Sequence, residues 1–214
     1  MTQRTGLLAL ALCVGILTTS ASAAAQEARL VGRLPDADRA RIDDILIAAR
    51  AAGLPTEPLV DRALEGAAKG APANLIVTAV VRLRGELDQA RIAFGDTASP
   101  AELTAGASAL RAGATSADLA RLRQLRPGLP LTVPAGVLAD LAAAGVPMET
   151  GLSAVLALAD EAADADYVAF RRNVERDIAL GASPVAAVGV RLRAVADDLA
   201  SSGDNRSAPR KRKP

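Results

Sequence analysis

One local pattern recurs along this chain: an Ala-rich stretch ends at Gly, and Pro, Ser or Thr follows within a few residues. Five such sites are Gly53-Leu54-Pro55, Gly70-Ala71-Pro72, Gly113-Ala114-Thr115-Ser116, Gly145-Val146-Pro147 and Gly181-Ala182-Ser183-Pro184. Glycine readily adopts the left-handed conformation that closes a helix, Ser or Thr caps the next helix, and Pro fits a first turn. The pattern therefore predicts tight turns between successive helices.

The stretches between these turns have the apolar spacing of helices. Ile42, Ile45, Leu46 and Ala49 lie on one helical face, and Ser99-Pro100-Ala101-Glu102 has the sequence of a capping box. Only residues 127–134 are expected to be extended. We expect helices at residues 36–52, 56–69, 72–94, 100–112, 116–126, 134–144, 148–163, 165–180 and 184–201.

Composition supports an all-α fold. Half of the 214 residues are apolar, mostly Ala, Leu and Val, while aromatic residues make up only 1% of the chain. Strong helix formers are thus abundant and strand-favouring aromatics are scarce. We expect short antiparallel helical hairpins, packed either as an irregular bundle or as a short superhelical array. The irregular spacing of the turn glycines does not match a tetratricopeptide, ankyrin or HEAT repeat.

The first 25 residues have the pattern of a signal peptide. Arg4 precedes an uninterrupted apolar run at residues 7–17, which is too short to span a bilayer comfortably. Small residues follow the run, and the polar residues Gln26 and Glu27 come next. We expect cleavage between Ala25 and Gln26, and therefore a periplasmic or secreted protein.

Charge divides the remaining chain into a helical body and a tail. Five basic residues crowd into the last nine positions, so residues 26–205 hold 19 basic and 24 acidic residues, a net charge of −5. We expect a helical domain at residues 26–200 and a disordered basic tail at 201–214. Candidate contacts of the tail with an anionic surface are Arg206, Arg210, Lys211, Arg212 and Lys213.

Composition also excludes several catalytic chemistries. The chain has no His, and its one Cys, Cys13, lies within the expected signal peptide. Neither a Ser-His-Asp nor a Cys-His arrangement can form in the mature chain, and zinc sites draw mainly on these same two residue types. We therefore expect no catalytic residue, no metal site and no cofactor.

The acidic cluster and the basic tripeptides have simple structural explanations. The cluster of Asp160, Glu161, Asp164 and Asp166 lacks the spacing of a calcium loop, and the helix dipole accounts for Asp164 as a cap and Asp166 in a first turn. Arg-Leu-Arg occurs at residues 82–84, 121–123 and 191–193. Carboxylates four residues later predict solvated ion pairs at residues 82, 84 and 193, beside a buried Leu.

The functional expectation is a non-enzymatic interaction or structural module of the bacterial envelope, with an unidentified protein partner and no nucleic acid. An alternative is a module that binds lipid head groups or phosphate-bearing polymers through the tail and the Arg-Leu-Arg segments. A weaker alternative is a glycan hydrolase that uses only acids. Such an enzyme usually holds sugar rings with aromatic residues, and this chain offers Phe94, Tyr167 and Phe170 alone, all in core stripes.

Overall fold

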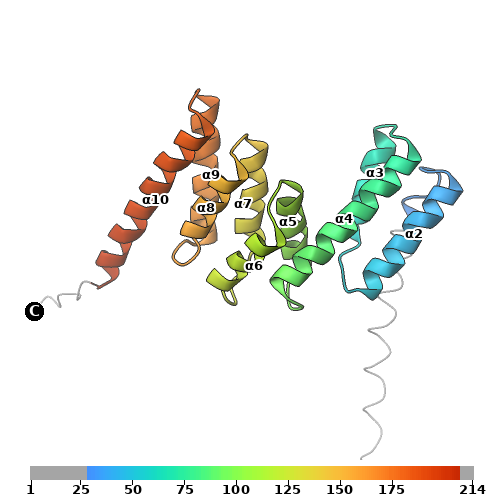
Figure 1. Cartoon of the computed structure of the whole chain (residues 1–214), viewed down its shortest axis with the longest axis horizontal. Helices are drawn as coiled ribbons and strands as arrows, with labels where there is room; N and C mark the ends of the chain where they lie inside the picture. Colours follow the sequence, from blue (N-terminus) through green and yellow to red (C-terminus); the bar gives the residue numbers. More distant parts are fainter. Residues whose placement is uncertain (1–27, 208–214) are drawn as a thin grey trace, which may run out of the picture. The chain divides into compact units, whose positions relative to one another are not determined.

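The computed structural model describes residues 28–207, with side chains to residue 198. Within this range it has nine helices and no strand, which confirms the all-α prediction. The expected signal peptide and the cleavage site at Ala25 and Gln26 lie outside the described residues. The helices are α2 (Asp36–Ala51), α3 (Glu57–Ala68), α4 (Ala73–Phe94), α5 (Pro100–Arg111), α6 (Ser116–Leu125), α7 (Thr132–Ala143), α8 (Met148–Ala157), α9 (Asp164–Ala179) and α10 (Pro184–Ser207) (Figure 1).

The helices end at the glycines that the sequence pattern identified. All five have a positive φ, between 66° at Gly70 and 113° at Gly113. The turn after α7 shows the hydrogen bonds of a Schellman motif: Val146 N–H donates to Leu141 C=O at 2.9 Å, and Gly145 N–H donates to Ala142 C=O at 3.0 Å. Equivalent bonds form at the other four sites, so the glycines close their helices by one common mechanism.

Replacement of Gly145 by Val should lower the free energy of unfolding by at least about 1 kcal/mol, because a β-branched residue resists its φ of 86°. Steric clash is a minor factor, since a Cβ at this position would lie 4.0 Å from its nearest neighbour, Pro184 Cγ. Gly136→Ala is the matched control, because Gly136 lies within α7 and a Cβ there meets nothing within 4 Å. This control should preserve or raise stability in urea unfolding. Equal effects of the two substitutions would contradict the assignment of Gly145 as a helix stop.

Three helix boundaries differ from the sequence expectation by more than one residue. Helix α7 begins at Thr132 rather than 134, because the first turn of a helix tolerates Pro134 without losing a hydrogen bond. Helix α8 ends at Ala157 rather than 163, and the backbone carbonyls that follow it turn toward Arg126. Helix α10 continues to Ser207, so residues 201–207 of the expected tail are helical. No Gly-Pro stop interrupts this stretch, and adding residues to an existing helix is easier than starting one.

The chain divides into two compact units, Met1–Arg84 and Gly85–Pro214, and the division falls within α4. In the first unit, α2 and α3 contribute a core of aliphatic side chains that includes the buried Ile42, Leu46 and Leu59. A Cβ on Gly66 would lie only 2.8 Å from Ile76 Cγ1, so the absence of a side chain allows this close contact.

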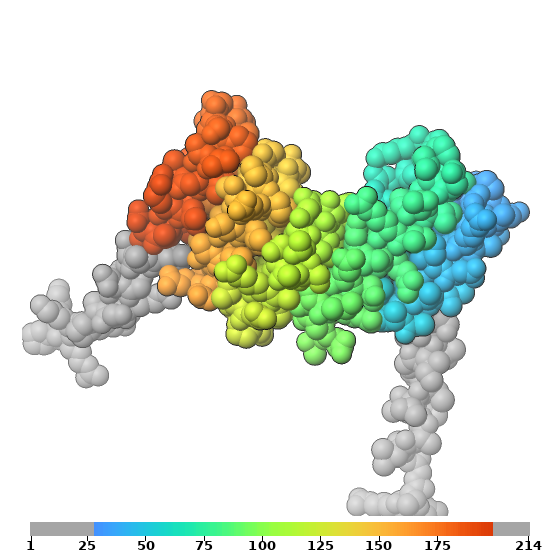
Figure 2. Space-filling model, in the orientation of Figure 1, coloured from blue at the N-terminus to red at the C-terminus, as the bar shows by residue number. Residues whose placement is uncertain are grey.

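In the second unit, alternate helices pack against each other. Helix α7 contacts α5 and α9, while α8 contacts α6 and α10. Helices α7 and α8 also contact each other, as do α9 and α10. Figure 2 shows the side chains filling the spaces that separate the ribbons of neighbouring helices. The core contains leucines together with Tyr167 and Phe170, both fully buried as expected from the helical stripe of α9.

Candidate functional site

Three charged residues of the described chain are buried: Glu86, Glu102 and Arg126. All three belong to the second unit. Buried charges require partners, because their removal from water is costly. Their surroundings are therefore the first place to search for chemistry.

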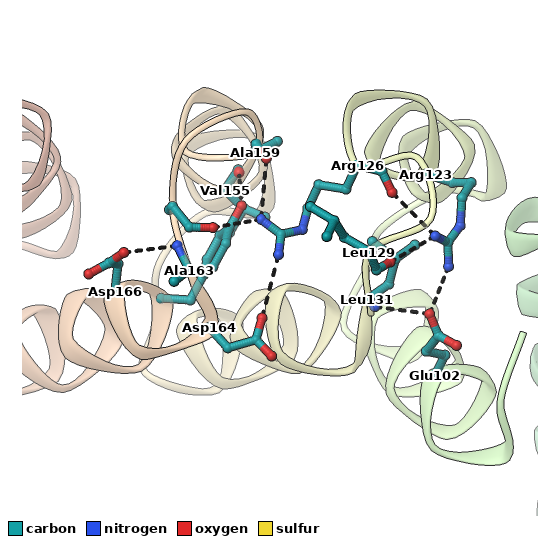
Figure 3. Close-up of polar contacts among 12 residues, drawn as sticks. Glu102, Arg123, Arg126, Leu129, Leu131, Val155, Ala159, Ala163, Asp164 and Asp166 are labelled. Carbon is teal, nitrogen blue, oxygen red and sulfur yellow. Dashed lines mark hydrogen bonds and ion pairs between the residues drawn. The ribbon is translucent and has the colours of Figure 1, made fainter. Parts of the chain in front are cut away.

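Glu102 joins three helices through both of its carboxylate oxygens. As residue N3 of α5, it accepts hydrogen bonds from the Ser99 backbone N–H and hydroxyl through Oε2, both at 2.9 Å. Through Oε1 it accepts bonds from Arg123 Nη2 of α6 at 2.7 Å and from the Leu131 N–H before α7 at 2.9 Å (Figure 3). The predicted capping box is confirmed, and the same carboxylate also binds the next two helices.

The hydrogen bonds keep Glu102 ionised. Burial by itself would raise the pKa of Glu102, but hydrogen bonds from the Ser99 and Leu131 N–H groups, the Ser99 hydroxyl and Arg123 outweigh burial and lower it. A general acid requires the opposite shift. Glu102 is therefore suited to hold cations and N–H groups in place and is unsuited to donate a proton.

A groove of about 380 Å³ lies beside the Glu102–Arg123 pair. The Arg123 guanidinium carbon lies 5.8 Å from the centre of the Phe94 ring, within cation–π distance. Arg123 also donates to the Leu129 carbonyl at 2.9 Å, which fixes one wall of the groove. Leu129 is 48% exposed and lies next to the exposed Pro130, so the groove combines exposed apolar side chains with the buried Phe94 and Glu102.

Arg126 links the loop after α6 to the turn between α8 and α9. Its Nη1 donates to the carbonyls of Ala159 at 3.2 Å and Ala162 at 2.8 Å, while Nη2 lies 3.5 Å from Asp164 Oδ1 (Figure 3). The guanidinium carbon is 5.3 Å from the centre of the Tyr167 ring. A cation at the carbonyl end of α8 is also favoured by the helix dipole. Arg126 therefore donates hydrogen bonds to two backbone carbonyls that lie just beyond the C-terminal end of α8.

Tyr167 acts as a hydrogen-bond donor in the core. Its hydroxyl donates to the Val155 carbonyl of α8 at 3.1 Å. Burial raises the pKa of Tyr167 to about 12, although the nearby Arg126 acts in the opposite direction. The phenol therefore stays protonated at neutral pH and anchors α9 to α8.

The acidic cluster differs in detail from its prediction. Ala163 occupies the N-cap of α9, and Asp164 is the first helical residue rather than the cap. Asp166 lies in the first turn as expected, and its Oδ2 accepts a hydrogen bond from the Ala163 N–H at 2.8 Å. Asp164 turns instead toward Arg126. Among the side chains that the structure describes, residues 28–198, no three or more acidic groups converge as metal ligands would.

The Arg-Leu-Arg segments match their predicted burial in part. Leu83 and Leu122 are buried as expected, whereas Leu192 is only partly buried. Arg123 reaches Glu102 of another helix, and Arg191 forms a two-pronged ion pair with Asp177 of α9 at 2.6 Å for both bonds. These two arginines thus connect helices through ion pairs.

The tail residues are covered only in part. Arg206 lies in the last turn of α10, whose side chains are not described, and Arg210, Lys211, Arg212 and Lys213 lie outside the described residues. Within the described part of the chain, no helix combines the length and the apolar character that a membrane crossing requires. No family model, curated protein or solved structure matches the chain.

Sequence reasoning missed the connecting role of Glu102 and Arg123 and did not single out Arg126. A local signal existed only for Glu102, through its capping box. Arg126 is an ordinary basic residue at a helix end, and its carbonyl partners carry no side-chain signature.

Proposed function

We propose that the protein is a non-enzymatic interaction module of the bacterial envelope, exported with cleavage after Ala25, and that the second unit forms a short superhelical array. The observation that carries this proposal is the contact of α7 with α5 and α9 in one series and of α8 with α6 and α10 in another. Arrays of stacked helix pairs expose extended surfaces, and such surfaces commonly bind other proteins.

The chemistry of the buried charges agrees with this function. Glu102, Glu86 and Arg126 are all engaged in contacts between helices, including the Glu86–Arg111 pair at 3.1 Å. Glu102 has a lowered pKa, which opposes the proton donor that an acid-only hydrolase needs. Glu102, a buried carboxylate that joins three helices, therefore supports a structural role.

The groove beside Arg123 is the proposed contact surface for the partner. Its exposed apolar residues, Leu129 and Pro130, line the same groove as a guanidinium held in a fixed position. These residues on the groove rim can bury apolar side chains of an envelope protein, while the positioned cation orients a carboxylate or a carbonyl.

A photo-crosslinking residue at Leu129 tests this surface in cells that express the full chain. It should give a discrete adduct with one envelope protein, and Pro130→Arg on the groove rim should reduce the yield. The matched control is a crosslinker at Leu180, which is 81% exposed and remote from this groove in the chain. Equal adducts at both positions, or none at Leu129, would refute the groove as the contact surface.

Fractionation of the same cells tests export. Protein recovered from the periplasm or the medium should begin at Gln26 when its N-terminus is sequenced. Recovery of the intact chain from the cytosol would refute the envelope location.

Binding of anionic surfaces by the basic tail is the second candidate function. The +5 charge of its last nine residues favours it, but Arg123 and Arg191 are already paired with Glu102 and Asp177. Binding to anionic vesicles should therefore depend on the tail, weaken with salt and survive substitution of Arg191. Vesicle binding that persists after deletion of residues 208–214 would contradict this candidate.

A further inference from the structure

Two features of the sequence are not used by the proposed contact groove: the acidic cluster at the start of α9 and the basic tail. The structure places the cluster next to a second groove, of about 260 Å³, between α9 and α10. Helix α9 contributes Asp166, Ala169 and Asn173 to this groove, and α10 contributes Arg191, Ala194 and Asp198.

The electrostatic character of this α9–α10 groove is acidic. Its one cation, Arg191, is neutralised by the two-pronged pair with Asp177, and the same pair lowers the pKa of Asp177. Asp166 and Asp198 therefore set the sign of the groove charge. The turn that leads into α9 adds the exposed Asp160 and Glu161 near the same helix end.

The chain itself carries a segment of opposite charge that begins close to this groove. Helices α9 and α10 run in opposite directions, so the C-terminal end of α10 lies at the same end of the pair as the start of α9 (Figure 1). From Asp198 to Ser207 the helix rises by roughly 13 Å. Residues 211–213 follow Ser207 by four to six positions, and an extended chain of that length reaches about 13–20 Å. The tail is thus long enough to return alongside α10 to Asp198.

We propose that the basic segment Arg210-Lys211-Arg212-Lys213 binds within its own chain to the groove between α9 and α10, with Asp166 and Asp198 as its ionic partners. The small side chains of Ala169 and Ala194 leave room for the aliphatic parts of the Lys and Arg side chains. Bound in this way, the tail is shielded from external anionic surfaces, and such a surface competes with the groove for it. The proposal does not depend on the protein partner proposed above.

Disulfide trapping in the full chain tests this contact. With Cys13 replaced by Ser the chain has no other thiol, so a pair introduced by Ala194→Cys and Lys213→Cys reports one contact alone. Ala194 lies roughly 20 Å before Ser207 along the helix, a distance that the six residues to Lys213 can span. The matched control pairs Ala196→Cys with Lys213→Cys. Both alanines are exposed, but two residues turn a helix by about 200°, so Ala196 points away from the groove. In about 0.01 M salt, the 194–213 disulfide should form about five-fold faster than the 196–213 disulfide.

The ionic origin of the contact is tested by salt and by single substitutions. In about 1 M salt the two rates should become similar, because the charges are then screened within about 3 Å. Asp198→Asn should reduce the advantage of the 194–213 pair, whereas Asp197→Asn, at the preceding residue, which does not line the groove, should not. Equal rates in low salt would overturn the proposal. Disulfides formed mainly between two chains would also overturn it, since they would assign the groove to the tail of a second copy.

Discussion

Arg126→Ala should lower the free energy of unfolding by about 3 kcal/mol. The substitution removes the donor from the Ala159 and Ala162 carbonyls, and it removes the cation that faces the ring of Tyr167. Because the Arg126 side chain is only 4% exposed, the substitution also leaves a cavity. The midpoint of thermal unfolding should fall by roughly 6–12 °C in a domain of this size. Urea unfolding monitored by circular dichroism measures the change directly.

Arg121→Ala is the matched control for Arg126→Ala. Arg121 lies on the same helix, α6, but is exposed to solvent. Its replacement should change stability by no more than about 0.5 kcal/mol. Arg126→Lys should fall between the two, because a Lys restores the positive charge but not the planar group that reaches both carbonyls and Asp164. If Arg126→Ala and Arg121→Ala were equally stable, the cluster around Arg126 would contribute nothing to the fold.

The helices could be predicted from the sequence because their signals are local. Gly145 closes α7 through bonds to Leu141 and Ala142, which lie only a few residues before it. The Ser99 and Glu102 capping box is equally short in range. When the residues that determine a structure lie within one or two turns of each other, spacing alone carries the information.

The buried clusters could not be predicted because their partners are distant in sequence, and several of these partners are backbone groups that any residue type supplies. Arg126 binds carbonyls 33 and 36 residues later, and any residue type supplies a carbonyl. Glu102 accepts from the Leu131 N–H, 29 residues away, for the same reason. Arg123 received no partner from the sequence pattern, and it binds Glu102 of α5 through a contact that only tertiary packing creates.

Glu102→Gln should lower the free energy of unfolding at neutral pH by about 2–3 kcal/mol. A glutamine presents one carbonyl oxygen and one NH₂ group. The NH₂ group replaces one of the two carboxylate oxygens, and as a donor it cannot accept the hydrogen bonds made on that side. Either the Ser99 group or the Leu131 and Arg123 pair then loses its acceptor. The loss should be visible in urea unfolding at pH 7.

The pH dependence of this loss distinguishes a carboxylate from a neutral hydrogen-bond acceptor. Since the pKa of Glu102 is lowered in the folded protein, the unfolded chain binds its proton more readily in the window just below the ordinary Glu value of about 4.3. Stability from Glu102 is therefore fully present above about pH 5 and is lost as the pH falls toward the lowered folded pKa. The difference between the natural chain and Glu102→Gln should shrink through this window. The acid sensitivity from Asp177 is common to both proteins and cancels in the difference.

A second carboxylate tests whether this narrowing belongs to Glu102 itself. Glu149 lies in the first turn of α8 and is exposed, so it is subject to the helix dipole but does not join separate helices. Glu149→Gln should cost less than about 1 kcal/mol at neutral pH. If the gap between the natural chain and Glu102→Gln stayed constant from pH 7 to the acid limit of folding, Glu102 could not be the ionised link that its contacts indicate. The three helices would then be joined by the shape of the side chain rather than by its charge.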